Sequence, residues 1–318
     1  MGKTTVLLRV SVEQHAGQRA LGRRAGRLRW VGRLATLLAG VVGVVTAAPT
    51  TAAASPAMML SDHVARALPV NEQVDYVALG DSYSSGVGTG VYDGASGDCF
   101  RSPLSYPPLW AGENQPASFG FVACSGARTD DVLANQIPAL QTSTDLVTIT
   151  IGGNDAEFGT VLRTCTAAQS DSTCFAAVDA AEAFSRTVLP GRLARTYEAI
   201  RRDAPDARVI VLGYPRLFDL TPSCADPLVP NLARRQRLND GADVLNTVIQ
   251  KAVSQHPGFS FTDVRGRFDG HGVCSADPWI NGPSVPTVVG PYHPNQTGYR
   301  EGYLDALDAA TGRAAEAA

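Results

Sequence analysis

Three nearly uninterrupted apolar runs, each ending on glycine, most constrain the fold of this chain. They are DYVALG at residues 75–80, LVTITIG at 146–152 and ARVIVLG at 207–213. Strands that are covered on both faces have this pattern, whereas strands with one solvated face alternate apolar and polar residues. Two shorter segments, SFGFVAC at 118–124 and FSFTDV at 259–264, complete a predicted set of five strands.

Helical patterns fall between these strands. Strands that alternate with helices imply a parallel sheet and an α/β fold. The segments at 84–117 and 214–230 are rich in Pro, Gly and Ser and predict long loops. The predicted helices lie within 129–140, 178–203, 231–253 and 296–310, with breaks at Pro138 and Pro190-Gly191.

The first 54 residues differ from the rest of the chain and predict a secretory signal. They hold eight Lys or Arg residues and one acidic residue, followed by an apolar stretch at 34–48 and the small-residue run PTTAAASPA. These are the parts of a signal peptide, and a bilayer span needs about 20 apolar residues. We expect cleavage near Ala54 or at Ala48. An uncleaved anchor is the alternative, and Arg23-Arg24 leaves a twin-arginine route open.

Removing this leader at 1–54 changes the charge of the protein. The full chain has 27 basic and 30 acidic residues; without the leader it keeps 19 and 29, a net charge of −10. An acidic protein without a basic stripe is a poor partner for nucleic acid or an anionic membrane surface. We expect no nucleic-acid partner and no stable membrane anchor. The remaining residues, 55–318, suffice for one α/β domain with no internal repeat or linker.

All six cysteines follow the leader, and an even number after an export signal predicts disulfides. Six cysteines allow 15 pairings, of which pairing of sequence neighbours closes the shortest loops. Zinc is the competing interpretation, but the chain has no Cys-x-x-Cys, no His-x-x-x-His and no cysteine beside a histidine. We therefore expect no metal and no cofactor. The cysteines are Cys99, Cys124, Cys165, Cys174, Cys224 and Cys274.

Small and polar residues follow four of the predicted strands, where reactive groups gather in parallel sheets. Ser82 is either an ordinary turn residue or a nucleophile. The backbone N–H groups of Ser82 and Gly126 and the side-chain amide of Asn154 are candidate donors to an oxyanion, although Gly and Asn also form turns. The four segments are Gly80-Asp81-Ser82, Cys124-Ser125-Gly126-Ala127, Gly152-Gly153-Asn154-Asp155 and Gly213-Tyr214-Pro215-Arg216.

A serine nucleophile needs a base, and only four histidines follow the leader. His63 precedes the first strand, and His256 lies at a helix end. His271 lies in a Gly-rich stretch, and His293 lies in GPYHPNQTGYREG, a loop that feeds the last helix. Elimination favours His293 as the base, and a structural histidine is the alternative.

Gly-Asp-Ser, the glycine after the second strand, Gly-Gly-Asn-Asp and His-Pro-Asn, in this order, resemble the SGNH hydrolases, also called GDSL esterases and lipases. The resemblance spans residues 74–305 and is closest to the secreted actinobacterial (Streptomyces-type) branch, with its GDSYSSG, CSGA, GGND and YHPN-type blocks and six cysteines. It implies a three-layer α/β/α sandwich around a mostly parallel, five-stranded, flavodoxin-like sheet. It also implies Ser82 as nucleophile, His293 as base, Ser82, Gly126 and Asn154 as oxyanion hole, and the disulfides Cys99–Cys124, Cys165–Cys174 and Cys224–Cys274.

One position departs from the common pattern of that family. Many members carry an aspartate three residues before the histidine, where this chain has Gly290. The resemblance then implies that a backbone carbonyl of Gly290-Pro291, assigned here to Gly290, orients the imidazole. Asp277 is the rival orienter. Because a neutral acceptor stabilises the imidazolium less than a carboxylate does, the expected machinery is a Ser–His dyad.

We therefore predict a secreted, monomeric ester hydrolase that acts on small-molecule or lipid esters through an acyl-enzyme. Phospholipase A-type and polysaccharide deacetylase activities are the alternatives among enzymes. A catalytically silent secreted binding protein is the alternative of another class. Aromatic residues in or near the long loops are candidates for an apolar acyl cleft, with core packing as the competing role: Tyr92, Phe100, Trp110, Phe158 and Phe218.

Overall fold

The computed structural model describes residues 74–284 and 290–312, so the predicted leader and His63 lie outside the described residues. At its centre five strands form one sheet in the order β2-β1-β3-β4-β5. Every neighbouring pair is parallel, so the sheet expected to be mostly parallel is wholly so. The strands are β1 (Asp75–Gly80), β2 (Ser118–Phe121), β3 (Leu146–Thr150), β4 (Arg208–Leu212) and β5 (Phe259–Thr262).

The three apolar runs form the middle of this sheet. All five residues of β3 are buried, as are all but the first residue of β1 and of β4. The edge strands β2 and β5 are only partly buried, which explains their weaker apolar pattern. The strand order is that of flavodoxin-like folds, in which ligands bind where the order reverses, between β1 and β3.

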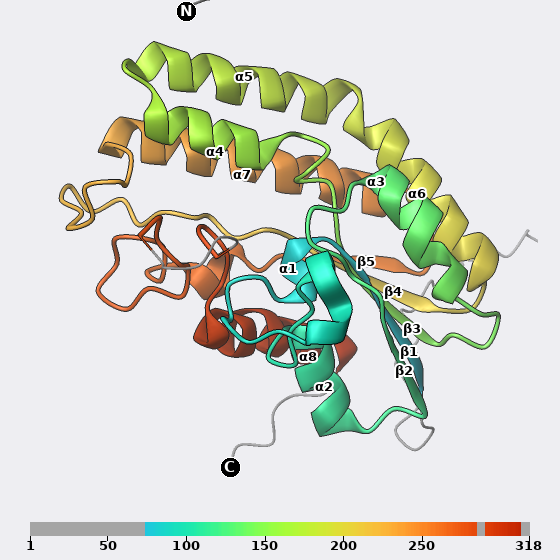
Figure 1. Ribbon diagram of the computed structural model, residues 1–318. Helices are drawn as coiled ribbons and strands as arrows, with labels where there is room; N and C mark the ends of the chain where they lie inside the picture. Colours follow the sequence, from blue (N-terminus) through green and yellow to red (C-terminus); the bar gives the residue numbers. More distant parts are fainter. Residues whose placement is uncertain (1–73, 285–289, 313–318) are drawn as a thin grey trace, which may run out of the picture. The chain divides into compact units, whose positions relative to one another are not determined.

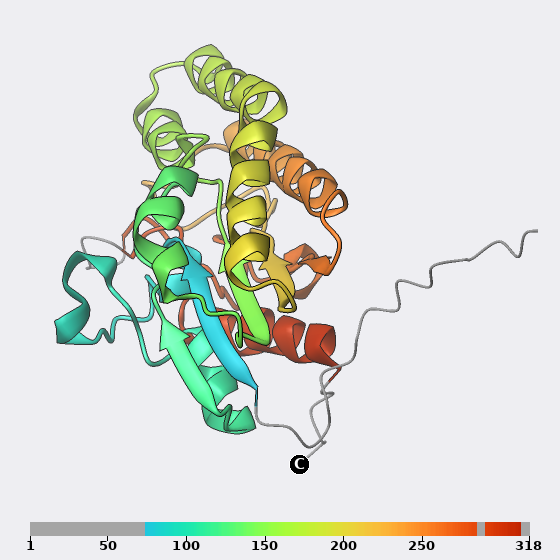
Figure 2. The same cartoon turned by 90° about the vertical axis from the view of Figure 1, so that its right-hand side faces the viewer.

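Helices cover both faces of the sheet and give it three layers (Figure 1). On one face lie α2 and α8, and on the other lie α6 and α7, as the view turned by 90° also shows (Figure 2). The helices α4 and α5 pack against each other, and α5 packs on α7, away from the sheet. The α-helices of the two faces and of this outer pair are α2 (Tyr106–Asn114), α4 (Phe158–Ala167), α5 (Asp171–Thr187), α6 (Leu189–Asp203), α7 (Leu232–Val253) and α8 (Asp305–Thr311).

Several helical predictions differ in detail from the structure. Helix α2 lies inside the predicted loop 84–117, and α4 lies in a stretch without a helical prediction. The helix predicted at 129–140 is instead α3 (Thr129–Asp131), the π-helical turn η2 (Val132–Gln136) and the 3-10 turn η3 (Ile137–Ala139), which contains Pro138. The predicted break near Pro190 falls at Val188, because a proline fits in the first turn of α6.

Short helical turns complete the described chain. The short helix α1 (Ser82–Ser85) directly follows β1, and η1 (Gly94–Cys99) lies in the following loop. The helix predicted at 296–310 is a π-helical segment, η5 (Gly298–Leu304), that continues into α8, and η4 (Arg265–Phe268) follows β5. Three disulfides join Cys99 to Cys124, Cys165 to Cys174 and Cys224 to Cys274, the pairs that the resemblance implies.

Candidate active site

Ser82 is the first residue of α1, directly beyond the carboxyl end of β1. The strand ends at Gly80, whose φ of 124° is in a region that L side chains rarely adopt. A Cβ at Gly80 would lie 2.4 Å from Ser84 Oγ and 2.6 Å from the Thr150 carbonyl. The sharp turn therefore requires glycine. Asp81 then caps α1, because its Oδ1 accepts from the backbone N–H of Tyr83 at 2.9 Å.

His293 lies opposite Ser82, although 211 residues separate the two in the sequence. Its Nε2 is 2.8 Å from Ser82 Oγ, and its Nδ1 is 2.9 Å from the Pro291 carbonyl oxygen. A carbonyl only accepts, so Nδ1 carries the proton and Nε2 keeps its lone pair. In this tautomer the Ser82 hydroxyl donates to Nε2, which is the arrangement that a general base requires.

The acceptor that orients this imidazole is Pro291, which corrects the expectation of Gly290. The Gly290 carbonyl accepts instead from the backbone N–H of His293, at 3.3 Å. Between them the chain turns through Tyr292, whose φ of 59° is left-handed, and the Pro291 carbonyl faces the ring. Asp277 is not the orienter either. Its carboxylate lies 3.4 Å from His271 Nδ1, so Asp277 interacts with His271 and not with His293.

The surroundings of His293 favour its neutral form. Removal of water from the imidazole lowers the pKa of His293 to about 4, and the hydrogen bond to the Pro291 carbonyl opposes this shift only partly. The ring of Tyr83 lies 5.0 Å from the imidazole, centroid to centroid. At neutral pH the imidazole is therefore uncharged and able to accept a proton.

Asn281 links the loop that carries His293 to Gly88 by one backbone and one side-chain hydrogen bond. The Asn281 N–H donates to the His293 carbonyl at 2.9 Å, and Asn281 Nδ2 donates to the Gly88 carbonyl at 2.8 Å. A Cβ at Gly88 would lie 2.3 Å from the Pro294 carbonyl oxygen. The glycine thus allows the segment after Ser82 to approach the histidine loop closely.

The three residues predicted to supply oxyanion donors, Ser82, Gly126 and Asn154, line one cavity together with His293. Gly126 has a left-handed backbone, with φ of 78°. Within the described part of the chain, the N–H groups of Ser82 and Gly126 have no hydrogen-bond acceptor. The Asn154 amide donates one N–H to the Ala127 carbonyl at 3.0 Å, which leaves its second N–H for another acceptor.

Two buried polar residues that hold these segments are not evident as such in the sequence. Asp155 accepts from the N–H and the hydroxyl of Thr129, at 2.9 and 2.7 Å, and so ties the segment after β3 to the segment after β2. Gln136 bonds both backbone groups of Gly80, at 2.7 and 2.9 Å. The Gly-Gly-Asn-Asp block marks Asp155 only as a turn residue, and no motif marks Gln136.

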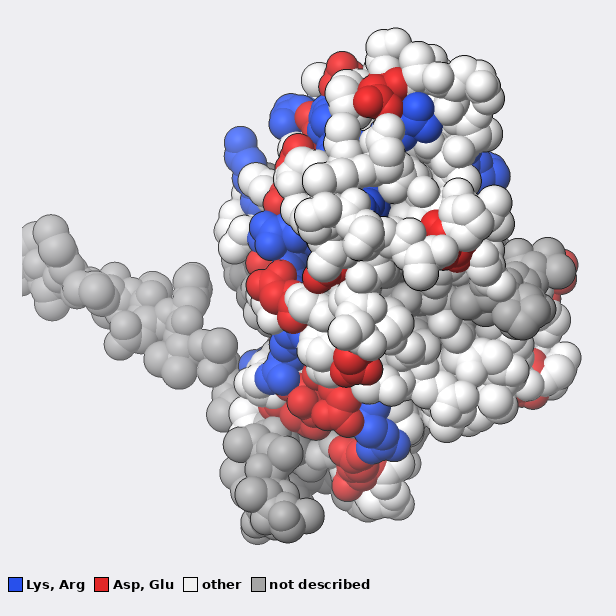
Figure 3. Space-filling view, turned by 90° about the vertical axis from the view of Figure 1, so that its left-hand side faces the viewer, with Lys and Arg blue, Asp and Glu red and all other residues white. Residues whose placement is uncertain are grey.

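The cavity beside Ser82 has a volume of about 380 Å³, within the usual range for small-molecule sites. Of the five aromatic candidates for an acyl cleft, only Phe158 lines it; Trp110 and Phe218 are core residues. The remaining apolar wall comes from Leu162, Leu217, Ala242, Leu245 and Tyr292. The face of the molecule at the carboxyl end of β1, where α1 begins, is mostly uncharged. Its charged residues gather toward one border (Figure 3).

Arg163 of α4 is, besides His293, the one basic residue among the described residues that line the cavity. It is exposed, and its Nη2 donates to Thr160 Oγ1 at 2.9 Å. In the part of the chain that the structure describes, no group of three or more His, Cys, Asp or Glu side chains is arranged to hold a metal ion. No helix in that part is long and apolar enough to cross a membrane.

Known proteins are similar to this chain over most of its length. The profile of the GDSL-like Lipase/Acylhydrolase family matches residues 78–301. Lipase 1 of Streptomyces coelicolor (strain ATCC BAA-471 / A3(2) / M145) is 43% identical over 284 residues, which cover 89% of this chain and 99% of the relative. Crystal structures of phospholipase A1 from Streptomyces albidoflavus NA297 and of an extracellular lipase from Streptomyces rimosus are each 48% identical. They superpose with TM-scores of 0.72 and 0.71, covering 74% of this chain and 99% of each structure.

Proposed function

Because this chain belongs to the GDSL-like lipase/acylhydrolase family and is an ester hydrolase, we propose that Ser82 is its nucleophile and His293 its general base. The observation that carries this proposal is the 2.8 Å hydrogen bond between Ser82 Oγ and His293 Nε2, with Nδ1 directed at a carbonyl. That pair of contacts selects the one tautomer that can take the serine proton.

The reaction proceeds through an acyl-enzyme. Ser82 Oγ attacks the ester carbonyl carbon while its proton passes to His293 Nε2. The negative charge on the carbonyl oxygen is stabilised by the N–H groups of Ser82 and Gly126 and by the Asn154 amide. His293 then protonates the departing alcohol, and the acyl group stays on Ser82. Water repeats the sequence, with His293 as its base, and releases the acid.

The cavity favours esters with an apolar acyl chain. Its apolar wall and its volume of about 380 Å³ suit a chain of several carbons, whereas an acetyl group would leave most of that space without contacts. Lipase and esterase activity is therefore the primary proposal, ahead of deacetylation of a polysaccharide. Water lost from the apolar chain on binding supplies the favourable free energy.

Phospholipase A-type activity is a second candidate, and Arg163 is the observation that favours it. Among the described residues its guanidinium donates to the Thr160 hydroxyl and has no carboxylate within ion-pair distance. An arginine at the mouth of the cavity offers paired donors that match a phosphate group. The solved structure of a Streptomyces phospholipase A1 at 48% identity is consistent with this candidate.

The decisive experiment compares the protein, with its disulfides formed, against its Ser82→Ala variant on p-nitrophenyl esters from acetyl to palmitoyl. We expect turnover with an optimum beyond acetyl, unaffected by a chelator, and a loss of about 10⁴-fold or more in Ser82→Ala. Ser254→Ala, at the exposed end of α7, is the matched control and keeps full activity. A folded protein without turnover on any ester would instead favour the silent binding protein.

Export is the remaining part of the proposal. A basic segment, a short apolar stretch and a small-residue exit support removal of residues 1–54 during secretion. The three disulfides are typical of proteins that fold in an oxidising compartment.

A further inference from the structure

A buried carboxylate that the acyl-transfer scheme does not use lies directly before the nucleophile. Asp81 is 1% exposed, and no Lys, Arg or His among the described residues forms an ion pair with it. Burial raises the pKa of Asp81 to about 7, against hydrogen bonds from Tyr214 and from the Tyr83 N–H that lower it. A carboxyl in such a place is retained at a free-energy cost, so its partners indicate what it does.

Its second oxygen is bound by a single hydroxyl. Tyr214 Oη donates to Asp81 Oδ2 at 2.5 Å, while the backbone N–H of Gly153 donates to the same Oη at 3.0 Å. The hydroxyl thus links the nucleophile turn after β1 to the turn after β3. Gly153 permits this approach, because a Cβ there would lie 3.2 Å from both Cζ and Oη of Tyr214.

Tyr214 is itself held firmly at the carboxyl end of β4. Its N–H donates to Asn246 Oδ1 at 2.9 Å, and Asn246 Nδ2 donates back to the Tyr214 carbonyl at 2.8 Å. Asn246 is fully buried on α7. The tyrosine ring also contacts the ring of Tyr83 edge to face, at 5.1 Å between centroids. The hydroxyl therefore has a fixed position relative to the sheet.

We propose that Tyr214 is a positioning residue for ester hydrolysis, holding Asp81-Ser82 and Gly153-Asn154 in register so that their donors meet on one oxyanion. The proposal rests on the proposed function above. Asn154 follows Gly153 directly, and one N–H of its side-chain amide already donates to the Ala127 carbonyl. The direction of its second N–H therefore depends on where the Gly153 backbone lies, and a displacement of about 1 Å at a reacting centre can lower a rate 100-fold.

The test is a double-mutant cycle on a p-nitrophenyl ester with the disulfide-bonded protein. Tyr214→Phe removes only the hydroxyl, and we expect kcat to fall about 10- to 100-fold with KM within twofold of the parent. Asn154→Ala alone is expected to lower kcat by about 10²- to 10³-fold. Because Tyr214 acts through that donor, the double variant should be less than about fivefold slower than Asn154→Ala.

Tyr303→Phe is the matched control. Tyr303 is also buried and donates to the Gly213 carbonyl at 2.9 Å, but no hydrogen bond joins it to Asp81 or Gly153. It should lose comparable stability to thermal unfolding while kcat changes less than threefold. Asp81→Asn, which keeps the shape but not both acceptors, should lower kcat as Tyr214→Phe does, and it serves as the second test if Tyr214→Phe fails to fold.

Two results would overturn the inference. One is a Tyr214→Phe protein with parental kcat, and the other is a cycle in which the two losses simply multiply. Either result with an inactive Ser82→Ala leaves the proposed function standing and removes only the role of Tyr214. Parental activity in Ser82→Ala removes the proposed function itself.

Discussion

At the scale of single residues, one backbone carbonyl decides how His293 can work. The Pro291 carbonyl oxygen accepts a hydrogen bond from His293 Nδ1 at 2.9 Å, so the imidazole is oriented without a carboxylate. A carboxylate would raise the pKa of the imidazole and stabilise its charged form, whereas a neutral carbonyl does so only weakly. The proposed base is therefore held in the tautomer that it needs, but it is a weak base.

This arrangement predicts an unusually acidic lower limb in the pH profile. The pKa of His293 is lowered to about 4 from its ordinary value near 6.5, so the imidazole is neutral above about pH 5 and loses its lone pair only as the pH falls through 4. We expect the lowest-pH limb of kcat/KM for a neutral ester to have its midpoint near pH 4.

The pH control is Asp81→Asn, because the pKa of Asp81 is raised to about 7 and its titration would affect the rate near neutrality. The limb near pH 4 should persist in that variant, whatever its maximal rate. A limb near pH 6.5 in both proteins would contradict the expected environment of His293.

The same scale shows what the sequence can and cannot reveal about the site. Ser82, Gly126 and Asn154 can be singled out from the sequence because they lie in short blocks after predicted strands, and His293 because it lies in a distinct block before the last helix. The structure brings all four to one cavity. The choice between the Gly290 and Pro291 carbonyls depends on a left-handed turn at Tyr292, a residue type that gives no signal for it. Long-range partners such as Tyr214 and Gln136 become visible only once the strands are placed side by side.

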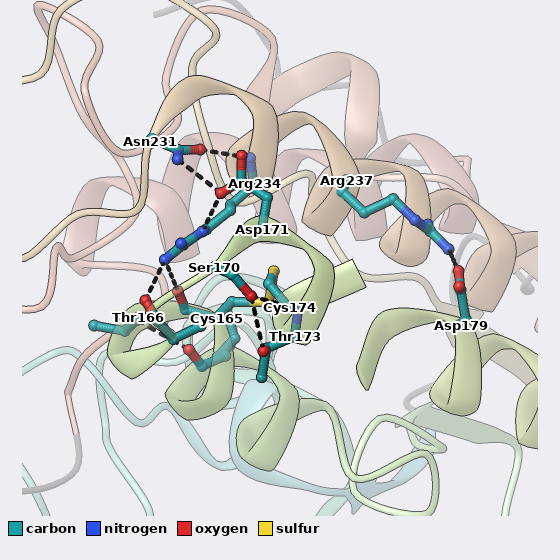
Figure 4. Close-up of a disulfide and its surroundings, with 12 residues drawn as sticks. Cys165, Thr166, Ser170, Asp171, Thr173, Cys174, Asp179, Asn231, Arg234 and Arg237 are labelled. Carbon is teal, nitrogen blue, oxygen red and sulfur yellow. Dashed lines mark hydrogen bonds and ion pairs between the residues drawn. A yellow bond between two sulfur atoms is a disulfide. The ribbon is translucent and has the colours of Figure 1, made fainter. Parts of the chain in front are cut away.

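At the scale of elements, α4 forms one wall of the cavity, and residues of α5 and α7 hold its carboxyl end in place. Figure 4 shows the disulfide between Cys165 and Cys174, with Arg234 of α7 above it in this view. Arg234 Nη1 donates to the Cys165 and Ala168 carbonyls at 3.1 and 2.9 Å, which caps the carboxyl end of α4. Its Nε donates to Asp171 of α5 at 2.7 Å. The wall is therefore tied to both α5 and α7.

The exposed side of that wall carries Arg163, and its role in substrate choice can be measured. We expect Arg163→Gln to lower kcat/KM for dihexanoylphosphatidylcholine about fivefold, the equivalent of about 1 kcal/mol for an exposed charge pair. The rate with p-nitrophenyl hexanoate, which has the same acyl chain and no phosphate, should stay within twofold. The ratio of the two values therefore isolates the phosphate contact.

Arg195→Gln is the control for Arg163. Arg195 is an exposed arginine of α6 that does not line the cavity, and its loss should leave the ratio unchanged. An equal loss on both esters in Arg163→Gln would mean that the arginine stabilises α4 rather than contacting phosphate, and phospholipase activity would lose its support.

The elements that the sequence missed share a physical cause. Helix α2 starts with Tyr106 followed by two prolines, and α4 has Gly159 at its second position, so local propensity gives little sign of either helix. Packing against η5 and α5 supplies what propensity lacks. The buried strands, in contrast, were predictable because burial on both faces requires an unbroken apolar run.

At the scale of the whole molecule, long connections at the carboxyl edge of the sheet carry much of the site, and disulfides shorten them. Cys124 lies two residues before Gly126, and the Ser125 N–H donates to the Cys99 carbonyl at 3.1 Å. The longest loop, closed by Cys224–Cys274, joins the segment after β4 to the segment after β5. The sheet places the starts of these loops side by side, and the disulfides restrict how far the loops can move.

Loop length therefore predicts how much each disulfide contributes. Sequence separations of 9, 25 and 50 residues correspond to about 2.5, 3.5 and 4 kcal/mol of unfolding free energy in the chain-entropy description. Replacing each pair by alanine should lower stability to guanidinium in that order. The Cys165–Cys174 variant should keep its kcat, because Arg234 still holds α4, while the Cys99–Cys124 variant should lose activity with Gly126 released.

Together the three disulfides contribute about 10 kcal/mol of unfolding free energy. This is comparable with the total of about 5–15 kcal/mol that is usual for a domain. The fully reduced protein should therefore be largely unfolded and inactive at 37 °C. Circular dichroism and ester hydrolysis, followed with and without reductant at equal temperature, measure this directly. A reduced protein that keeps both its sheet and its activity would show that the core alone suffices, and the dependence of this fold on an oxidising compartment would be refuted.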